Sequence, residues 1–355
     1  MPMMIEKFNY NIQSARILFG SGRIKELADE VSGLRCCKAL VLTKPRQADI
    51  GEVALTHLGK LGVGLHPEAV MHTPVEVTEK AVAVVKDKGA DCLVAVGGGS
   101  TIGLAKAIAL RTGLPQIAVP TTYAGSEVTP VLGETKDGLK TIRRSADILP
   151  KVVIYDVEQT LRLNPAISAS SGLNAVAHAV EALYAKDANP VISIMAETGI
   201  AALARSLPVI TEQPTHLQAR TEALYGAWLC GTCLGTVGMA LHHKLCHVLA
   251  GTFNLPHSET HSILLPHSMA YNARAVPQAA SRVAKALGKS DAAQGLYDLL
   301  KKLKIPIALR EIGMPEDGLQ RAVALSFQQS YWNPRPLEEA PLKRLLENAF
   351  QGAAP

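Results

Sequence analysis

The sequence predicts two domains of different classes: an α/β domain with a mostly parallel sheet, followed by an all-helical domain. The length of 355 residues exceeds what a single average core holds. In the first part, short β-rich apolar runs alternate with helical patterns, as a parallel sheet with crossover helices requires. After Asp156, long Ala/Leu-rich segments dominate and nothing looks like a hairpin. We therefore expect domains at residues 1–160 and 161–355.

The expected strands are nearly continuous apolar runs, as in strands that are covered on both faces. They are 38–43, 91–100, 115–122 and 151–156, with helical patterns at 76–90 and 101–113 between them. The expected helices of the second domain are 168–186, 190–207, 216–235, 238–251 and 275–289.

Composition excludes several classes of protein. The formal net charge is +5, and the tightest basic cluster, around Arg143 and Arg144, is too small to indicate nucleic-acid binding. Six cysteines without regular spacing do not form a disulfide framework, and Cys230 and Cys233 are expected in a helical core. The N-terminus shows no signal peptide, and no run of 18 apolar residues suggests a membrane span. We therefore expect a cytoplasmic protein without nucleic-acid or membrane partners.

A glycine-rich turn follows the expected strand 91–100. Gly97, Gly98 and Gly99 permit a close backbone approach, and the helix after Ser100 presents unpaired N–H groups and a positive dipole end. The pattern is neither GxGxxG nor a P-loop, so taken alone it leaves open a nucleotide site or a plain strand–helix turn.

Hydroxyl side chains follow the next strand. Thr121, Thr122 and Ser126 lie in PTTYAGSEVTP, where small polar residues line the ligand crevice of open α/β sheets. Two such loops after consecutive strands favour a nucleotide site over ordinary loop polarity.

GGGS before a helix, PTT…GSEVT, a helix with His178, and H-x3-H…PH together resemble the iron-containing alcohol dehydrogenase family, within the dehydroquinate synthase-like superfamily. The resemblance spans nearly the whole chain. The wording of GGGSTIGLAKAIAL, VPTTYAGSEVTPVLGET and SASSGLNAVAHAVEALYA resembles the maleylacetate reductase branch of that family.

The resemblance implies a Rossmann-like dinucleotide-binding domain, a helical catalytic domain and an active site in the cleft between them. It implies an NADH- or NADPH-dependent oxidoreductase of the cytoplasm that forms a homodimer. The residues that it places at the cofactor are Gly97, Gly98, Gly99, Ser100, Thr121, Thr122, Ser126 and Lys140.

Six of the eleven histidines lie within residues 242–267. Neutral imidazole is a common metal ligand and also titrates near neutrality, so the cluster fits either a metal site or an acid–base site. By resemblance, the positions of the metal ligands are Asn174, His178, His243 and His257, with His247 behind them. We expect His242 in packing or at the surface, and His261 and His267 in structural roles.

This sequence departs from metal-dependent relatives at the one charged ligand. Asn174 stands where they have Asp, and a neutral amide should bind Fe²⁺ or Zn²⁺ more weakly than a carboxylate. Gly103 replaces an Asp near the cofactor, and His261 replaces an Asn. We therefore expect catalysis without a metal.

The resemblance implies reduction of the carbon–carbon double bond of maleylacetate to 3-oxoadipate during degradation of aromatic compounds. Hydride addition leaves an enolate that needs hydrogen-bond donors and a proton. We expect His178, His243, His247, His257 and Asn174 to provide them.

A dicarboxylate substrate needs cationic or amide ligands. Asn333 and Arg335, in the proline-rich YWNPRP segment, are candidates, although a surface turn explains that segment equally well. Lys44 and Arg46 follow the second strand, where an Asp is expected for NAD preference, so either cofactor remains open.

Three alternatives remain. One is a metal-dependent alcohol dehydrogenase of the same family, and another is a dehydroquinate synthase-like or polyol dehydrogenase-like enzyme. The third is a non-catalytic nucleotide-binding protein.

Overall fold

The computed structural model describes residues 7–11, 15–137, 139–328 and 331–355, which divide into two compact units. One unit spans Ile12–Leu163, and the other comprises Asn164–Pro355 together with the described residues before Ile12. The division falls close to the predicted boundary after residue 160. Each unit has its own core and is described by itself.

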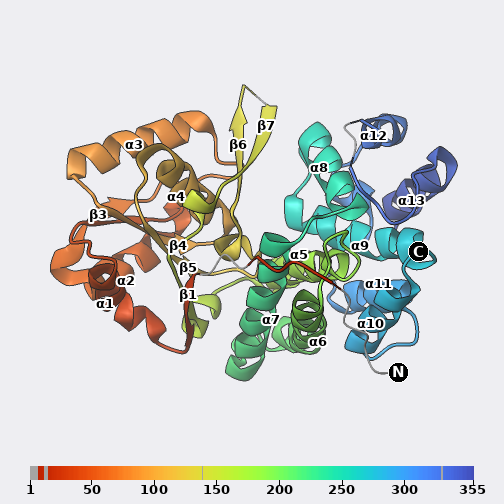
Figure 1. The fold of residues 1–355 in the computed structure, drawn as a ribbon, viewed down its shortest axis with the longest axis horizontal. Helices are drawn as coiled ribbons and strands as arrows, with labels where there is room; N and C mark the ends of the chain where they lie inside the picture. The colour runs from red at the N-terminus through yellow and green to blue at the C-terminus, as the bar shows by residue number, and fades with distance from the viewer. Residues whose placement is uncertain (1–6, 12–14, 138, 329–330) are drawn as a thin grey trace. The chain divides into compact units, whose positions relative to one another are not determined.

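A six-stranded parallel sheet forms the centre of the first unit (Figure 1). Its order is β1-β8-β5-β4-β2-β3, and every pairing is parallel. The strands are β1 (Arg16–Gly20), β2 (Ala39–Leu42), β3 (Gly62–His66), β4 (Cys92–Gly97), β5 (Gln116–Pro120) and β8 (Val152–Asp156). The α/β class and its parallel sheet are therefore confirmed.

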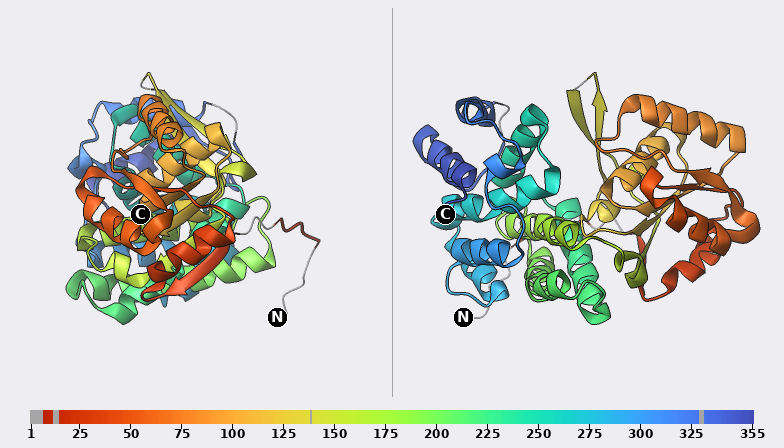
Figure 2. Two further views of the ribbon diagram at one scale, coloured as in Figure 1. Left: turned by 90° about the vertical axis from the view of Figure 1, so that its left-hand side faces the viewer. Right: turned by 180° about the vertical axis from the view of Figure 1, so that it is seen from behind.

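Four helices cover both faces of this sheet, with α1 and α2 on one side and α3 and α4 on the other (Figures 1 and 2). Alternate strand residues such as Val94 and Val96 pack toward α1 and α2 in one apolar cluster. The other strand residues are also buried, which explains the near-continuous apolar runs. The helices are α1 (Leu27–Gly33), α2 (Ala48–Leu58), α3 (Val75–Lys88) and α4 (Gly99–Thr112).

An antiparallel hairpin of β6 (Val131–Lys136) and β7 (Leu139–Arg144) was not predicted. It lies outside the main sheet and carries alternating polar residues. Lys140, a predicted cofactor residue, lies on β7, and its side chain is outside the described part of the structure.

The second unit contains helices throughout its regular structure, as predicted. A core of leucines from α8, α9 and α13 includes Leu241, Leu264 and Leu346. The helices are α5 (Pro165–Ala182), α6 (Pro190–Glu212), α7 (Leu217–Thr236), α8 (Leu241–Phe253), α9 (His257–Ala273), α10 (Pro277–Leu287), α11 (Ala292–Lys302), α12 (Gly318–Ser326) and α13 (Glu339–Gln351).

Within the described residues, α6 is long and apolar enough to cross a membrane by length and composition, and so is the bent pair α7–α8 if it counts as one span. Half of the apolar stretch of α6 is buried inside the protein. A core helix passes the same test, so this is weak evidence for a span.

A buried lysine fastens the loop that follows β5. Lys106 on α4 is fully buried, and its ammonium donates to the backbone oxygens of Thr129 at 2.6 Å and Val131 at 3.0 Å. It also donates to Ser126. Burial lowers the pKa of Lys106 to about 7, while the nearby carboxylate of Glu127 acts to raise it. One side chain therefore fixes residues 126–131 onto the helix that starts at the glycine turn.

We predict that Lys106→Met lowers the free energy of unfolding by about 3 kcal/mol, because it leaves several buried carbonyl oxygens without a donor. Urea denaturation of the full chain measures the change. Lys80→Met, at an exposed position of α3, is the control and should be nearly neutral. Equal effects of the two exchanges would contradict the assigned role.

Candidate functional site

Helix α5 places three polar side chains on one buried face. Asn174, His178 and Glu181 are spaced i, i+4 and i+7, so they lie along the same side of the helix. Their exposed fractions are 3%, 3% and 0%. The helix starts at Pro165, where the side chain of Asn164 accepts a hydrogen bond from the N–H of Ala166.

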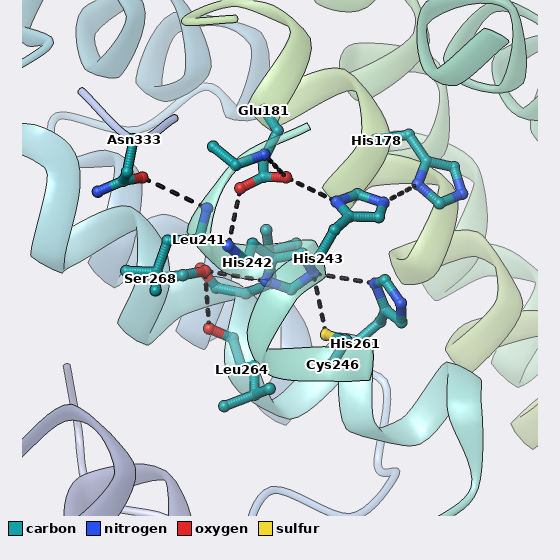
Figure 3. A network of polar contacts seen from close by, with 12 residues as sticks. His178, Glu181, Leu241, His242, His243, Cys246, His261, Leu264, Ser268 and Asn333 are labelled. Atoms are coloured by element: carbon teal, nitrogen blue, oxygen red, sulfur yellow. Dashed lines mark hydrogen bonds and ion pairs between the residues drawn. The ribbon is translucent and has the colours of Figure 1, made fainter. Parts of the chain in front are cut away.

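Glu181 caps the next functional helix, α8, from outside its own sequence. The residue before α8, Ala240, has no side-chain cap of its own. The Glu181 carboxylate accepts the N–H of Ala240 at 2.9 Å and that of His242 at 2.8 Å (Figure 3). A negative charge at this end is favoured by the helix dipole. The start of α8 is therefore fixed against α5.

The same carboxylate orients a pair of histidines. Nδ1 of His243 lies 2.6 Å from Glu181 Oε2, and Nε2 of His243 lies 2.9 Å from Nδ1 of His178. All three side chains are buried. They form a continuous relay, Glu181–His243–His178, along which a proton can move between the carboxylate and the far imidazole.

A second chain of hydrogen bonds connects Ser268, His242 and His261. Ser268 Oγ donates to the carbonyl of Leu264 at 3.0 Å, so the Nδ1–H of His242, 2.9 Å away, donates to Ser268. Nε2 of His242 then accepts from Nδ1 of His261 at 3.0 Å. This leaves Nε2 of His261 as a buried acceptor without a hydrogen-bond partner. Burial lowers the pKa of both histidines well below its usual value, which keeps them neutral.

The turn between α8 and α9 adds two more imidazoles. Asn254 ends α8 in the left-handed conformation, and Pro256 directly precedes His257, the first residue of α9. The His257 ring stacks on that of His247 with centroids 6.4 Å apart, and it lies 4.5 Å from the ring of His261. His247 is exposed, so the cluster reaches the surface on this side.

The structure thus brings together the predicted residues His178, His243, His247 and His257, and Asn174 lies on the helix face that carries His178. Two other histidines also belong to this part of the structure. His242, expected in packing or at the surface, is fully buried, and His261, expected in a structural role, contacts the ring of His243. Glu181 was missed, although its spacing from Asn174 and His178 was visible in the sequence.

Asn333 and Arg335 are engaged in contacts within the protein. Asn333 exchanges two hydrogen bonds with Asn272 and accepts the N–H of Leu241 at 3.3 Å. The guanidinium of Arg335 lies 4.2 Å from the ring centroid of Tyr271 and donates to the Tyr271 carbonyl. These contacts hold their loop on α9, and the predicted role in substrate binding stays a prediction.

In the other unit, the predicted cofactor residues lie at the carboxyl ends of neighbouring strands. Gly97 of β4 is in register with Pro120 of β5, and the Thr121 N–H donates to the Gly97 carbonyl. A Cβ on Gly98 would lie 2.8 Å from the Thr122 side chain, whereas one on Gly99 would meet nothing within 4 Å. The start of α4 therefore leaves room for a ligand at Gly99.

Gly103 is explained by local packing. A Cβ at this position would lie 2.6 Å from the hydroxyl of Thr73, which is buried against α4. The residue at 103 must therefore be small.

The side chains at the four ligand positions that the resemblance implies do not fit a metal well. The amide oxygen of Asn174 is neutral and has no hydrogen-bond partner. His178 and His243 direct nitrogens at each other at 2.9 Å, whereas two nitrogens on a tetrahedral zinc lie about 3.3 Å apart. Among the described residues, the ligand atoms that gather within 4.8 Å belong to His242, Cys246 and His261 instead.

The two units, with their glycine turn and histidine cluster, place the chain in a known class of oxidoreductases. The iron-containing alcohol dehydrogenase pattern matches residues 14–157, and its C-terminal part matches residues 168–350. The chain belongs to the iron-containing alcohol dehydrogenase family and is an oxidoreductase.

Several similar relatives are named maleylacetate reductase. Maleylacetate reductase of Sphingobium indicum is 51% identical over 98% of this chain and 99% of its own length. The crystal structure of maleylacetate reductase from Agrobacterium tumefaciens is 51% identical, with a TM-score of 0.96 over 99% of this chain and 100% of that chain. The Rhizobium sp. strain MTP-10005 enzyme is 50% identical, with a TM-score of 0.95 over the same shares.

We predict that the free energy of unfolding falls as the pH drops from 6.5 to 4, because burial lowers the pKa of His267 to about 4. In that window the unfolded chain binds a proton that the folded chain does not, which costs about 3 kcal/mol in all. The neutral form contributes its full stability above pH 6.5. Urea denaturation at several pH values measures the slope.

His267→Asn should make this dependence shallower. Leu345→Ala removes a buried apolar side chain but no titrating group, so it should lower stability and keep the slope of the wild type. An unchanged slope in His267→Asn would contradict the prediction.

Proposed function

We propose that the protein reduces the carbon–carbon double bond of maleylacetate to give 3-oxoadipate, using a reduced nicotinamide nucleotide and no metal. The observation that carries this proposal is the buried histidine cluster with Glu181 behind it and no carboxylate at position 174. Relatives about 50% identical over the full length, named maleylacetate reductase, support the choice of substrate.

The glycine turn supplies the nucleotide site in this proposal. Gly97, Gly98, Gly99 and Ser100 hold the pyrophosphate at the start of α4, and Thr121, Thr122 and Ser126 lie along the cofactor. The open space at Gly99 supports this use. Lys140 is proposed to lie near the cofactor, on the basis of the resemblance alone.

When bound, the reduced nicotinamide supplies the hydride that is added to the alkene carbon β to the ketone. The ketone oxygen then carries the enolate charge, and a proton must reach the carbon α to it. A preorganised donor that is kept from water stabilises such a charge far better than solvent does. These two tasks define what the side chains of the cluster do.

His178 performs both tasks in our proposal, as the donor to the enolate oxygen and as the source of the proton. It lies at the end of the relay from Glu181 through His243, so a proton held on the relay is available at its outer nitrogen. Asn174, one helical turn away, offers a neutral amide whose oxygen lacks a partner. We assign the proton transfer to the relay and the orientation of the substrate to Asn174.

His247 and His257 take the two carboxylates of the substrate. Their stacked rings lie at the exposed side of the cluster, where donors to an anion cost less desolvation. Asn333 and Arg335, predicted for this task, instead hold α8 and α9 in place. An Asn333→Ala exchange would act through the position of Leu241 at the start of α8.

The choice between NADH and NADPH depends on the loop after β2. Lys44 is partly buried, which lowers the pKa of its ammonium, and Arg46 is exposed. Both side chains can donate hydrogen bonds to a 2′-phosphate, and we propose that the protein uses either nucleotide. We further propose a cytoplasmic homodimer that acts in the degradation of aromatic compounds.

The direct test is oxidation of NADH with maleylacetate before and after exhaustive treatment with EDTA. We expect turnover in both cases and less than stoichiometric iron or zinc in the purified protein. Turnover of simple aldehydes without turnover of maleylacetate would overturn the substrate. One metal ion per chain, with activity lost to the chelator, would establish the metal-dependent alternative. Binding of NADH without any turnover would indicate the non-catalytic one.

We predict that Glu181→Gln lowers kcat at least tenfold while KM for maleylacetate changes little. A glutamine of the same size has one acceptor atom, so it cannot accept both backbone N–H groups and the His243 ring. Steady-state kinetics across pH 5–9 should also show a shifted optimum, because the relay loses its charge. Glu222→Gln, in an exposed ion pair with Arg205, is the control and should keep wild-type kinetics.

A further inference from the structure

A pocket lies in the helical unit between α9 and α13. Its volume is about 330 Å³, at the small end of the range for ligand sites. The walls include Tyr271 of α9 and Pro341 and Leu345 of α13. The histidines of the proposed reaction site, His178, His243, His247 and His257, do not line it. The proposed function leaves this pocket without a role.

Helix geometry separates this pocket from the cluster. At 100° per residue, His257, His261 and Ser268 share one side of α9, whereas His267, Ala270 and Tyr271 point roughly 60–160° away from it. Consistent with this, Ser268 contacts His242 while His267 lines the pocket. Helix α9 therefore contributes side chains both to the histidine cluster and to the pocket.

His267 is an unusual residue for a pocket wall. It is 98% buried, with 2% of its surface exposed, and neither ring nitrogen has a hydrogen-bond partner among the described residues. Leaving a buried polar group without a partner costs about 1–3 kcal/mol. A neutral imidazole at the inner end of a pocket offers one donor and one acceptor to a ligand.

The outer end of the pocket is cationic. Arg344 is exposed, and the structure shows no hydrogen bond or ion pair between it and another described residue. Arg335 adds a second guanidinium, held flat on Tyr271 and paired with Glu338 at 3.3 Å. None of the side chains that line the pocket is acidic, and the wall also includes Pro355, the last residue. A free guanidinium binds a carboxylate through two parallel hydrogen bonds.

We propose that this pocket binds a small hydroxylated carboxylate, with the carboxylate on Arg344, the apolar body between α9 and α13, and the hydroxyl on His267. The order of the three parts follows from burial, because the arginine lies at the exposed end and the histidine at the buried one. A hydroxyl group can meet either nitrogen of the imidazole, since it both donates and accepts. The site is separate from the one assigned to the reductase reaction.

The test is isothermal titration of the full-length protein with 4-hydroxybenzoate and with benzoate, which lacks the hydroxyl. We expect 4-hydroxybenzoate to bind about fivefold more tightly, as one net hydrogen bond allows. Arg344→Gln should weaken both ligands at least tenfold. His267→Phe should remove the difference between the two ligands.

Two controls separate the pocket from other anion sites. Arg321→Gln, at an exposed position of α12, should bind both ligands as the wild type does. His243→Ala, in the cluster, should also retain binding, which shows that the ligands do not occupy the reaction site. Because Arg344 is exposed, its exchange leaves the fold intact even if His267→Phe does not fold.

The proposal is overturned if neither ligand shows saturable binding below about 20 mM. It is also overturned if Arg344→Gln binds as the wild type does, or if His243→Ala abolishes binding. Neither result affects the reductase assignment, which is measured by turnover.

Discussion

The histidine cluster depends on one buried carboxylate. Glu181 receives two backbone N–H groups from the start of α8 and the ring of His243, so it fixes a helix and an imidazole at once. An isolated carboxylate at this depth would be strongly disfavoured, and the three donors offset that cost. Without Glu181, neither the start of α8 nor the tautomer of His243 would be defined.

In this arrangement the negative charge of Glu181 lies on the side of His243 that faces away from His178. A carboxylate at position 174 would face a metal directly, whereas Glu181 reaches His243 on the nitrogen that points away from His178. A carboxylate bonded to one imidazole nitrogen orients the ring and sets which nitrogen carries the proton. The neutral amide at position 174 and the buried carboxylate of Glu181 on His243 therefore support the proposal of proton transfer without a metal.

The sequence predicts the two kinds of domain well because strong patterns mark them. Continuous apolar runs predicted β2, β4, β5 and β8, and Ala/Leu-rich segments predicted α5, α6 and α7. The hairpin of β6 and β7 was missed because its strands are polar. Its local signal was an Asp-Gly pair, and Asp137 has a positive φ of 51°, as such turns require.

The site was predicted where residue spacing determines contact and missed where contact is tertiary. Positions 174 and 178, or 243 and 247, share a helix face by geometry alone. Nothing local indicates that Glu181 caps another helix, or that Arg335 stacks on Tyr271. Nor does spacing reveal that His242 and His261, on different helices, share a proton.

Helix α9 shows why such contacts matter for function. Two of its sides are committed: one carries His261, Ser268 and Asn272, which contact the cluster and the 331–338 loop, and the other carries His267 in the wall of the pocket. A displacement of this helix would change the His242–His261 contact and the Asn333 contact with Leu241 together, because both partners are on α8 or at its start. The geometry of the imidazoles is thus set by how α9 packs, and the short turn of residues 254–256 joins His257, the first residue of α9, to the end of α8.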